Sequence, residues 1–207
     1  MKNNTLLLIF LILTNLSFGQ KSESDLKMIT EYSSNNLEIS DILDFEGIQY
    51  LKIKFIGQKL KNKSYHLTVK EIWDGKIISD TTLMNSRSLP YEWMQKISDT
   101  TLNMKVISKL TINNKLKMTF KFPGFSFNKE FEAYQTKDKY SLRNVAEESN
   151  LEIGYNKKFY LLAYILPYDS KDGHKRYCDV GTSGKDIENW GSKFGIKHYL
   201  LFEMKLE

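Results

Sequence analysis

The sequence predicts a mainly β protein, an antiparallel β-sandwich or small barrel with one or two short helices. Apolar and polar residues alternate along most segments after Gly47, a period of two that is typical of half-buried strands. Turn residues such as Asp74-Gly75 and Asn113-Asn114 separate these segments, as in β-hairpins. Long helical periodicities are missing from the same region, which favours an all-β class.

The first strands follow directly from this alternation. Residues 50–56 are expected to form a strand with Leu51, Ile53 and Phe55 on one face and lysines on the other. A hairpin is predicted over residues 65–83, because Asp-Gly favours a type I′ turn, in which both central residues adopt positive φ.

A second hairpin is predicted from residues 102–112 and 116–122, whose apolar residues occupy alternate positions. Pro123-Gly124 ends its return strand, and residues 125–134 continue as extended structure. Residues 86–97 contain Pro90 and are expected to form a crossover or a short helix between the two hairpins.

The C-terminal third alternates between strand and helix. Residues 159–166 are apolar on both faces, which predicts a central strand and is far short of the about 20 apolar residues that span a bilayer. A helix is predicted over residues 184–194, capped by Ser183 and ended by Gly195. Residues 196–206 are expected to close the chain as a strand.

The N-terminus has the order of a secretory signal peptide. Lys2 precedes the apolar run Leu6–Leu13, and Ser17 and Gly19 place small residues before a cleavage point at Gln20. Residues 1–19 are therefore predicted to be removed on export to the periplasm or the medium. The mature chain is expected to carry no transmembrane anchor.

Two further parts make up the predicted mature chain. Residues 20–45 are interpreted as a polar lead-in, in which apolar residues at positions 26, 29 and 32 favour a short helix over 25–32. Residues 46–207 are expected to form a single β-rich domain, a length that can bury a substantial core without disulfides.

Composition excludes several partners. The chain has a formal net charge of +5, and its basic residues are lysines apart from Arg87, Arg143 and Arg176. Because specific phosphate and base recognition favours arginine, we expect no nucleic-acid partner and interpret the lysines as a solvated surface. We expect no metal and no cofactor, since the three histidines are scattered without ligand spacing.

Reactive residues concentrate in one loop, residues 172–179. His174, Cys178 and Asp179 are the candidate catalytic residues there, because an imidazolium lowers the pKa of a nearby thiol. We expect instead that Cys178, the only cysteine, is a buried structural thiol. Trp73, Trp93 and Trp190 could bind a sugar if they were exposed together; aromatic residues on strands are more often part of a core.

These observations predict an exported, non-enzymatic β-rich protein that binds a protein, a glycan or another envelope partner. Two alternatives stay open. One is a secreted hydrolase that uses the 172–179 loop, and the other is a carrier of a small apolar ligand, which requires an internal cavity.

Overall fold

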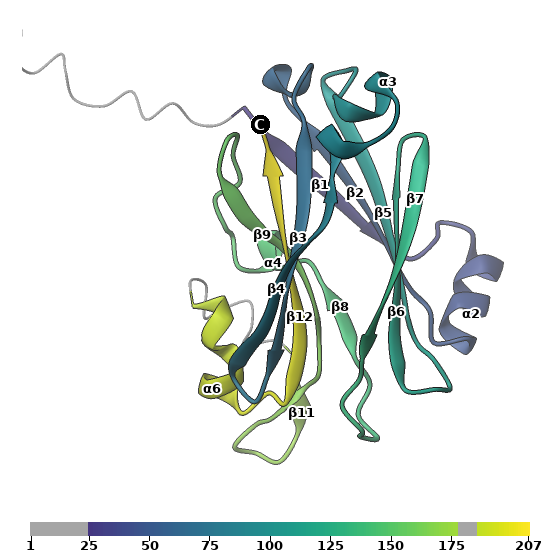
Figure 1. The fold of residues 1–207 in the computed structure, drawn as a ribbon. Helices are drawn as coiled ribbons and strands as arrows, with labels where there is room; N and C mark the ends of the chain where they lie inside the picture. Colours follow the sequence, from purple (N-terminus) through teal and green to yellow (C-terminus); the bar gives the residue numbers. More distant parts are fainter. Residues whose placement is uncertain (1–24, 178–185) are drawn as a thin grey trace, which may run out of the picture.

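Two five-stranded antiparallel sheets packed face to face form the fold in a computed structural model, which describes residues 25–177 and 186–207 (Figure 1). Sheet A has the strand order β1-β2-β5-β6-β7, and sheet B has the order β4-β3-β12-β9-β8. Each sheet is open, with two edge strands. The predicted sandwich is therefore confirmed, and the chain does not form the barrel.

The strands of sheet A are β1 (Lys27–Tyr32), β2 (Gln49–Ile56), β5 (Thr101–Leu110), β6 (Lys115–Phe122) and β7 (Phe125–Glu132). Those of sheet B are β3 (Tyr65–Trp73), β4 (Lys76–Asn85), β8 (Ser141–Arg143), β9 (Lys158–Ile165) and β12 (His198–Leu206). A small separate hairpin joins β10 (Tyr168–Asp169) to β11 (Lys175–Arg176). The α-helices of the described residues are α2 (Leu37–Phe45), α3 (Glu92–Gln95), α4 (Val145–Glu148) and α6 (Trp190–Phe194). Three 3₁₀ turns are η1 (Gln58–Leu60), η2 (Ser86–Ser88) and η3 (Ile187–Asn189).

Both predicted hairpins are present. Asp74 and Gly75 have φ values of 47° and 75° at the β3–β4 turn, as a type I′ turn requires. Asn114 has a φ of 54° in the loop between β5 and β6. The residues at these two turns thus determine the β3–β4 and β5–β6 connections.

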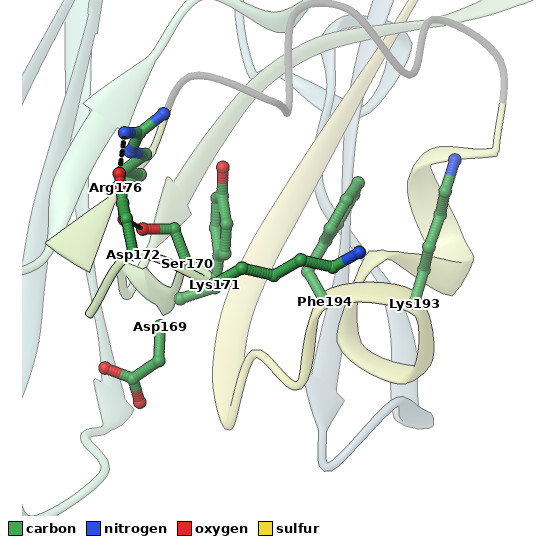
Figure 2. A pocket seen from close by; sticks show the side chains of 8 residues that line it. Asp169, Ser170, Lys171, Asp172, Arg176, Lys193 and Phe194 are labelled. Carbon is green, nitrogen blue, oxygen red and sulfur yellow. Dashed lines mark hydrogen bonds and ion pairs between the residues drawn. The ribbon is translucent and has the colours of Figure 1, made fainter. Parts of the chain in front are cut away.

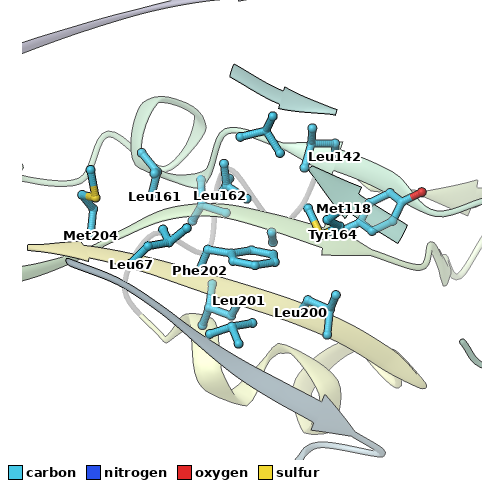
Figure 3. Close-up of a cluster of buried hydrophobic side chains, with 14 of the residues drawn as sticks. Leu67, Met118, Leu142, Leu161, Leu162, Tyr164, Leu200, Leu201, Phe202 and Met204 are labelled. Atoms are coloured by element: carbon cyan, nitrogen blue, oxygen red, sulfur yellow. The ribbon is translucent and has the colours of Figure 1, made fainter. Parts of the chain in front are cut away.

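The core lies between the sheets and consists of the predicted inward faces. Leu51, Ile53 and Phe55 are buried, as the alternation predicts. The Phe202 ring of β12 lies 5.4 Å from that of Phe120 on β6, so the two sheets contact each other through aromatic rings. Figure 3 shows the apolar side chains that β9 and β12 contribute to this layer.

The N-terminal lead-in differs from the prediction. Residues 27–32 form β1, and the predicted helix over 25–32 is wrong. The six residues pair in register with β2, because the backbone ladder of an open sheet edge satisfies more polar groups than a short helix does. The helix of this region is α2, over residues 37–45.

Two other boundaries also differ. The strand predicted over residues 102–112 ends at Leu110, and Ile112 is fully exposed in the turn rather than part of the core. The helix predicted over 184–194 is a 3₁₀ turn followed by α6, ended as predicted by Gly195 at a φ of 71°. Its first residues and the Ser183 cap lie outside the described residues.

Candidate functional site

The outer face of sheet A carries a concentration of lysines. Strand alternation turns the residues between the core positions outward, and on β2, β5 and β6 these are largely lysines. We call this group the lysine face and define it as Lys52, Lys54, Lys105, Lys117 and Lys121. All but Lys52 are exposed, and Lys52 is half-buried.

Strand register aligns three of these lysines. Lys52 on β2 lies opposite Lys105 on β5, and Lys105 lies opposite Lys121 on β6. Like charges directly opposite each other destabilise a sheet, by about 0.2–1 kcal/mol for such pairs. The row therefore lowers the stability of sheet A. Residues that lower stability locally in this way are typical of functional surfaces.

Acidic groups neutralise only part of the outer face of sheet A. Lys109 pairs with Glu46 and Lys115 with Glu132, and Lys117 lies opposite Glu130 on β7. Lys52 Nζ lies 3.0 Å from Glu31 Oε2 on the neighbouring edge strand. Four members of the lysine face make no ion pair with any residue of 25–177 or 186–207; these are Lys54, Lys105, Lys117 and Lys121. The face thus presents uncompensated positive charge to solvent.

A shallow hollow of about 340 Å³ opens on the same face, over β1, β2 and β5. Its polar lining consists of Lys52, Lys54, Lys105, Asn103 and Glu31, whose carboxylate pairs with Lys52 and leaves the lysines in excess. Ile29 supplies an apolar side chain that is half-exposed. The hollow combines ammonium groups, an amide and aliphatic carbon. These are groups that can bind an anionic, hydroxyl-bearing ligand.

The helix α2 borders the lysine face and buries none of its side chains. Lys109 on β5 donates to Glu46 just after the helix at 2.7 Å, which holds α2 on the side of sheet A that faces away from sheet B (Figure 1). Large apolar side chains are exposed along it, namely Leu37, Ile39, Ile42 and Phe45.

Sequence reasoning missed the lysine face, because it interpreted the lysines as dispersed. The signal was present in the alternation itself. Lysines occupy all the outward positions of residues 52–54, 105–109 and 115–121 except Ile107 and Thr119, so three predicted strands already shared a cationic outer side.

The three tryptophans do not gather on one surface. Trp190, the first residue of α6, is fully buried, so it cannot contact a ligand. Trp73 stacks on His198 at one end of β3, with ring centroids 4.1 Å apart. Trp93 is exposed next to Tyr91, near the opposite end of β3. The structure therefore does not assemble a tryptophan platform.

The 172–179 loop is only partly described. His174 is exposed on the β10–β11 hairpin, where its backbone N–H faces Asp172 at 3.3 Å. Cys178 and Asp179 lie outside the described residues, so their relation to His174 stays a prediction.

A pocket of about 560 Å³ lies between this hairpin and α6, and His174 is not among its lining residues (Figure 2). The Asp172 carboxylate accepts from Ser170 and Arg176, as the dashed lines in Figure 2 mark. The Ser170 hydroxyl, the His174 backbone N–H and the Arg176 charge hold the pKa of Asp172 below its ordinary value. The charged groups of the pocket are thus partly satisfied by one another.

A buried polar cluster occupies one end of the space between the sheets. His198 is fully buried, and its Nδ1 lies 2.6 Å from Tyr140 Oη. The Tyr134 backbone N–H donates to the same oxygen. The other ring nitrogen, Nε2, lies 3.7 Å from Glu71 Oε1 and makes no hydrogen bond within the described residues.

This Glu71–His198–Tyr140 arrangement has the order of a proton relay, but His198 is sealed from solvent and Tyr140 nearly so. Burial lowers the pKa of His198 to about 4, so the ring is neutral near pH 7. A substrate reaches it only if the sheets separate. We therefore interpret the cluster as structural.

Residues 25–177 and 186–207 lack two further features. No group of three or more His, Cys, Asp or Glu side chains there is placed to hold a metal ion. None of the helices in that part of the chain has the length and apolar character needed to cross a membrane.

Comparison with known proteins yields no relative for this arrangement. No protein-family model matches the chain, and no curated protein or solved structure matches it either. The candidate function therefore rests on the geometry and charge of the lysine face.

Proposed function

We propose that this protein is exported and acts without catalysis, as a β-sandwich that binds an anionic partner outside the cytoplasm. The in-register row of Lys52, Lys105 and Lys121 carries the proposal. Directly opposed ammonium groups oppose folding, and an anion placed over them converts that repulsion into attraction. The signal-peptide pattern of residues 1–19 supports the export step.

The geometry of the row suits a partner with several charges. Directly opposite residues of antiparallel strands lie about 5 Å apart at their Cα atoms, so the three flexible side chains can meet neighbouring anionic groups together. A lysine held near an anionic surface contributes about 1 kcal/mol of binding free energy. The row can make three such contacts at the same time, whereas an isolated solvated lysine makes only one.

Replacing the row with glutamine is expected to abolish most binding to a polyanion. We expect the variant K52Q/K105Q/K121Q to bind dextran sulfate about a hundredfold more weakly at low ionic strength, at about 1 kcal/mol for each lost lysine. Isothermal titration calorimetry measures the change. Thermal unfolding should show a variant at least as stable as the parent, since the opposed charges are gone.

A matched variant removes the same charge elsewhere. Lys76, Lys171 and Lys193 are exposed and lie on β4, the β10–β11 hairpin and α6. K76Q/K171Q/K193Q should keep its affinity within about threefold, because these lysines lie outside β2, β5 and β6, the strands that carry the row. Equal losses in the two variants would mean that net charge alone drives binding, and the proposal would be wrong.

A second candidate function rests on α2. Four large apolar side chains are exposed on this nine-residue helix, with Phe45 at 89% and Leu37 at 79%. Exposed apolar clusters of this kind mark protein interaction sites. A protein partner bound through α2 would keep its affinity for K52Q/K105Q/K121Q, which separates the two candidates.

A further inference from the structure

We infer that the anionic partner is a linear polyuronate, a polysaccharide with one carboxylate on each ring, that lies across β2, β5 and β6, along the row of Lys52, Lys105 and Lys121. This inference rests on the proposed function and names its ligand class. The row runs perpendicular to the strands, because its members are direct cross-strand partners. A chain following the row therefore crosses the sheet from strand to strand.

Spacing favours a polymer with one charge per unit. Neighbouring strands lie about 4.8 Å apart, which is close to the length of one sugar ring. A polyuronate carries one carboxylate on each ring, so successive carboxylates can reach successive lysines. An ammonium group makes charge-assisted hydrogen bonds to such carboxylates.

The hollow beside the row provides contacts for the sugar ring itself. Its lining includes Lys54 and Asn103, which form the next outward-facing cross-strand pair of β2 and β5, beside the row. The Asn103 amide can donate to and accept from ring hydroxyls. Ile29, on the far side of Lys54 and 51% exposed, offers aliphatic carbon to the C–H face of a ring. Charge, hydroxyl and apolar contacts thus converge within one depression.

A flat bilayer fits this surface poorly. Figure 1 shows α2 projecting on the outer side of sheet A, so a planar membrane meets the helix before the lysines. A narrow chain can reach the row beside α2, and this favours a polysaccharide over a lipid surface.

Nucleic acid is disfavoured by the position of the arginines. All three lie away from sheet A, on η2, β8 and β11. Each is already paired with an acid: Arg87 with Glu207, Arg143 with Glu148, and Arg176 with Asp172. The lysine face therefore lacks the bidentate groups that read phosphates and bases.

The test uses the full mature protein and galacturonate oligomers of increasing length. We expect affinity to rise about fivefold with each added carboxylate, hence about thirtyfold from the monomer to the trimer, and to level off once the row is spanned. Calorimetry at low ionic strength measures these affinities. Neutral maltohexaose should not bind, and Asn103→Ala should weaken binding of the trimer.

Two results would overturn the inference while leaving the proposed function standing. One is row-dependent binding of dextran sulfate without any binding of the galacturonate trimer. The other is binding to vesicles of phosphatidylcholine with about one-third phosphatidylglycerol that exceeds binding to the trimer. If dextran sulfate itself binds K52Q/K105Q/K121Q as well as the parent protein, the proposed function fails first.

Discussion

Replacing Gly191 with alanine is expected to lower the free energy of unfolding by about 3 kcal/mol, the upper part of the range for overpacked interiors. A Cβ atom at Gly191 would lie 2.5 Å from Gly75 Cα and 2.7 Å from Gly75 N. Both neighbours are backbone atoms of the β3–β4 turn, so no side chain can rotate away. The turn and α6 fit together only because glycine occupies both positions.

The contact matters because α6 and the residues just before it cover the outer side of β12. The Tyr199 hydroxyl donates to the Ile187 carbonyl at 2.9 Å. The buried ring of Trp190, the first residue of α6, lies 6.3 Å from the Tyr199 ring. Gly75→Val should cost at least as much as Gly191→Ala, since valine also resists the φ of 75°.

Urea denaturation measures the free energy of unfolding, and Gly47→Ala is the matched control. Gly47 has a φ of 63° and no atom within 4 Å of a Cβ built there, so its replacement should cost only about 1–2 kcal/mol of backbone strain. A loss at Gly191 no larger than the loss at Gly47 would contradict the packing described for the turn.

The second large effect is a loss of stability in weak acid. Burial lowers the pKa of His198 to about 4, whereas histidine in the unfolded chain titrates near 6.5. Between these values the unfolded chain binds a proton that the folded protein excludes, so stability falls as the pH falls. Linkage gives a decrease of about 2–3 kcal/mol between about pH 7.5 and pH 4.5.

The groups around His198 limit the choice of control. Tyr140, Tyr134 and Glu71 face it from the neighbouring loop and from β3. His198→Gln keeps an acceptor for the Tyr140 hydroxyl and removes the titrating ring. The free energy of unfolding of this variant should fall less steeply over the same pH range, and parallel curves for the two proteins would refute the assignment.

The alternation of apolar and polar residues was sufficient to predict most of the fold. Burial of one face forces apolar residues onto every second position, and Leu51, Ile53 and Phe55 show this pattern without exception. Asp74 and Gly75 predicted the position of the β3–β4 hairpin, because both adopt the positive φ that a type I′ turn requires. These features depend only on residues close together in the chain.

The features that the sequence did not predict depend on contacts between residues far apart in the chain. The strand β1 exists because β2 offers an open edge, which the spacing at positions 26, 29 and 32 does not reveal. The helix α2 buries no side chain, so it has no row of core-facing apolar residues from which the sequence could predict it. The lysine row is set by the pairing of β2 with β5, about fifty residues apart, and alternation gives only the face on which each lysine lies.

Lysine acetylation footprinting tests the lysine face most directly. The mature protein is acetylated briefly with and without dextran sulfate, and mass spectrometry gives the rate at each lysine. We expect protection at Lys52, Lys105 and Lys121, with unchanged rates at the exposed Lys76 and Lys193 on other faces. Protection spread evenly over all five, or confined to Lys76 and Lys193, would contradict the proposal that sheet A carries the binding surface.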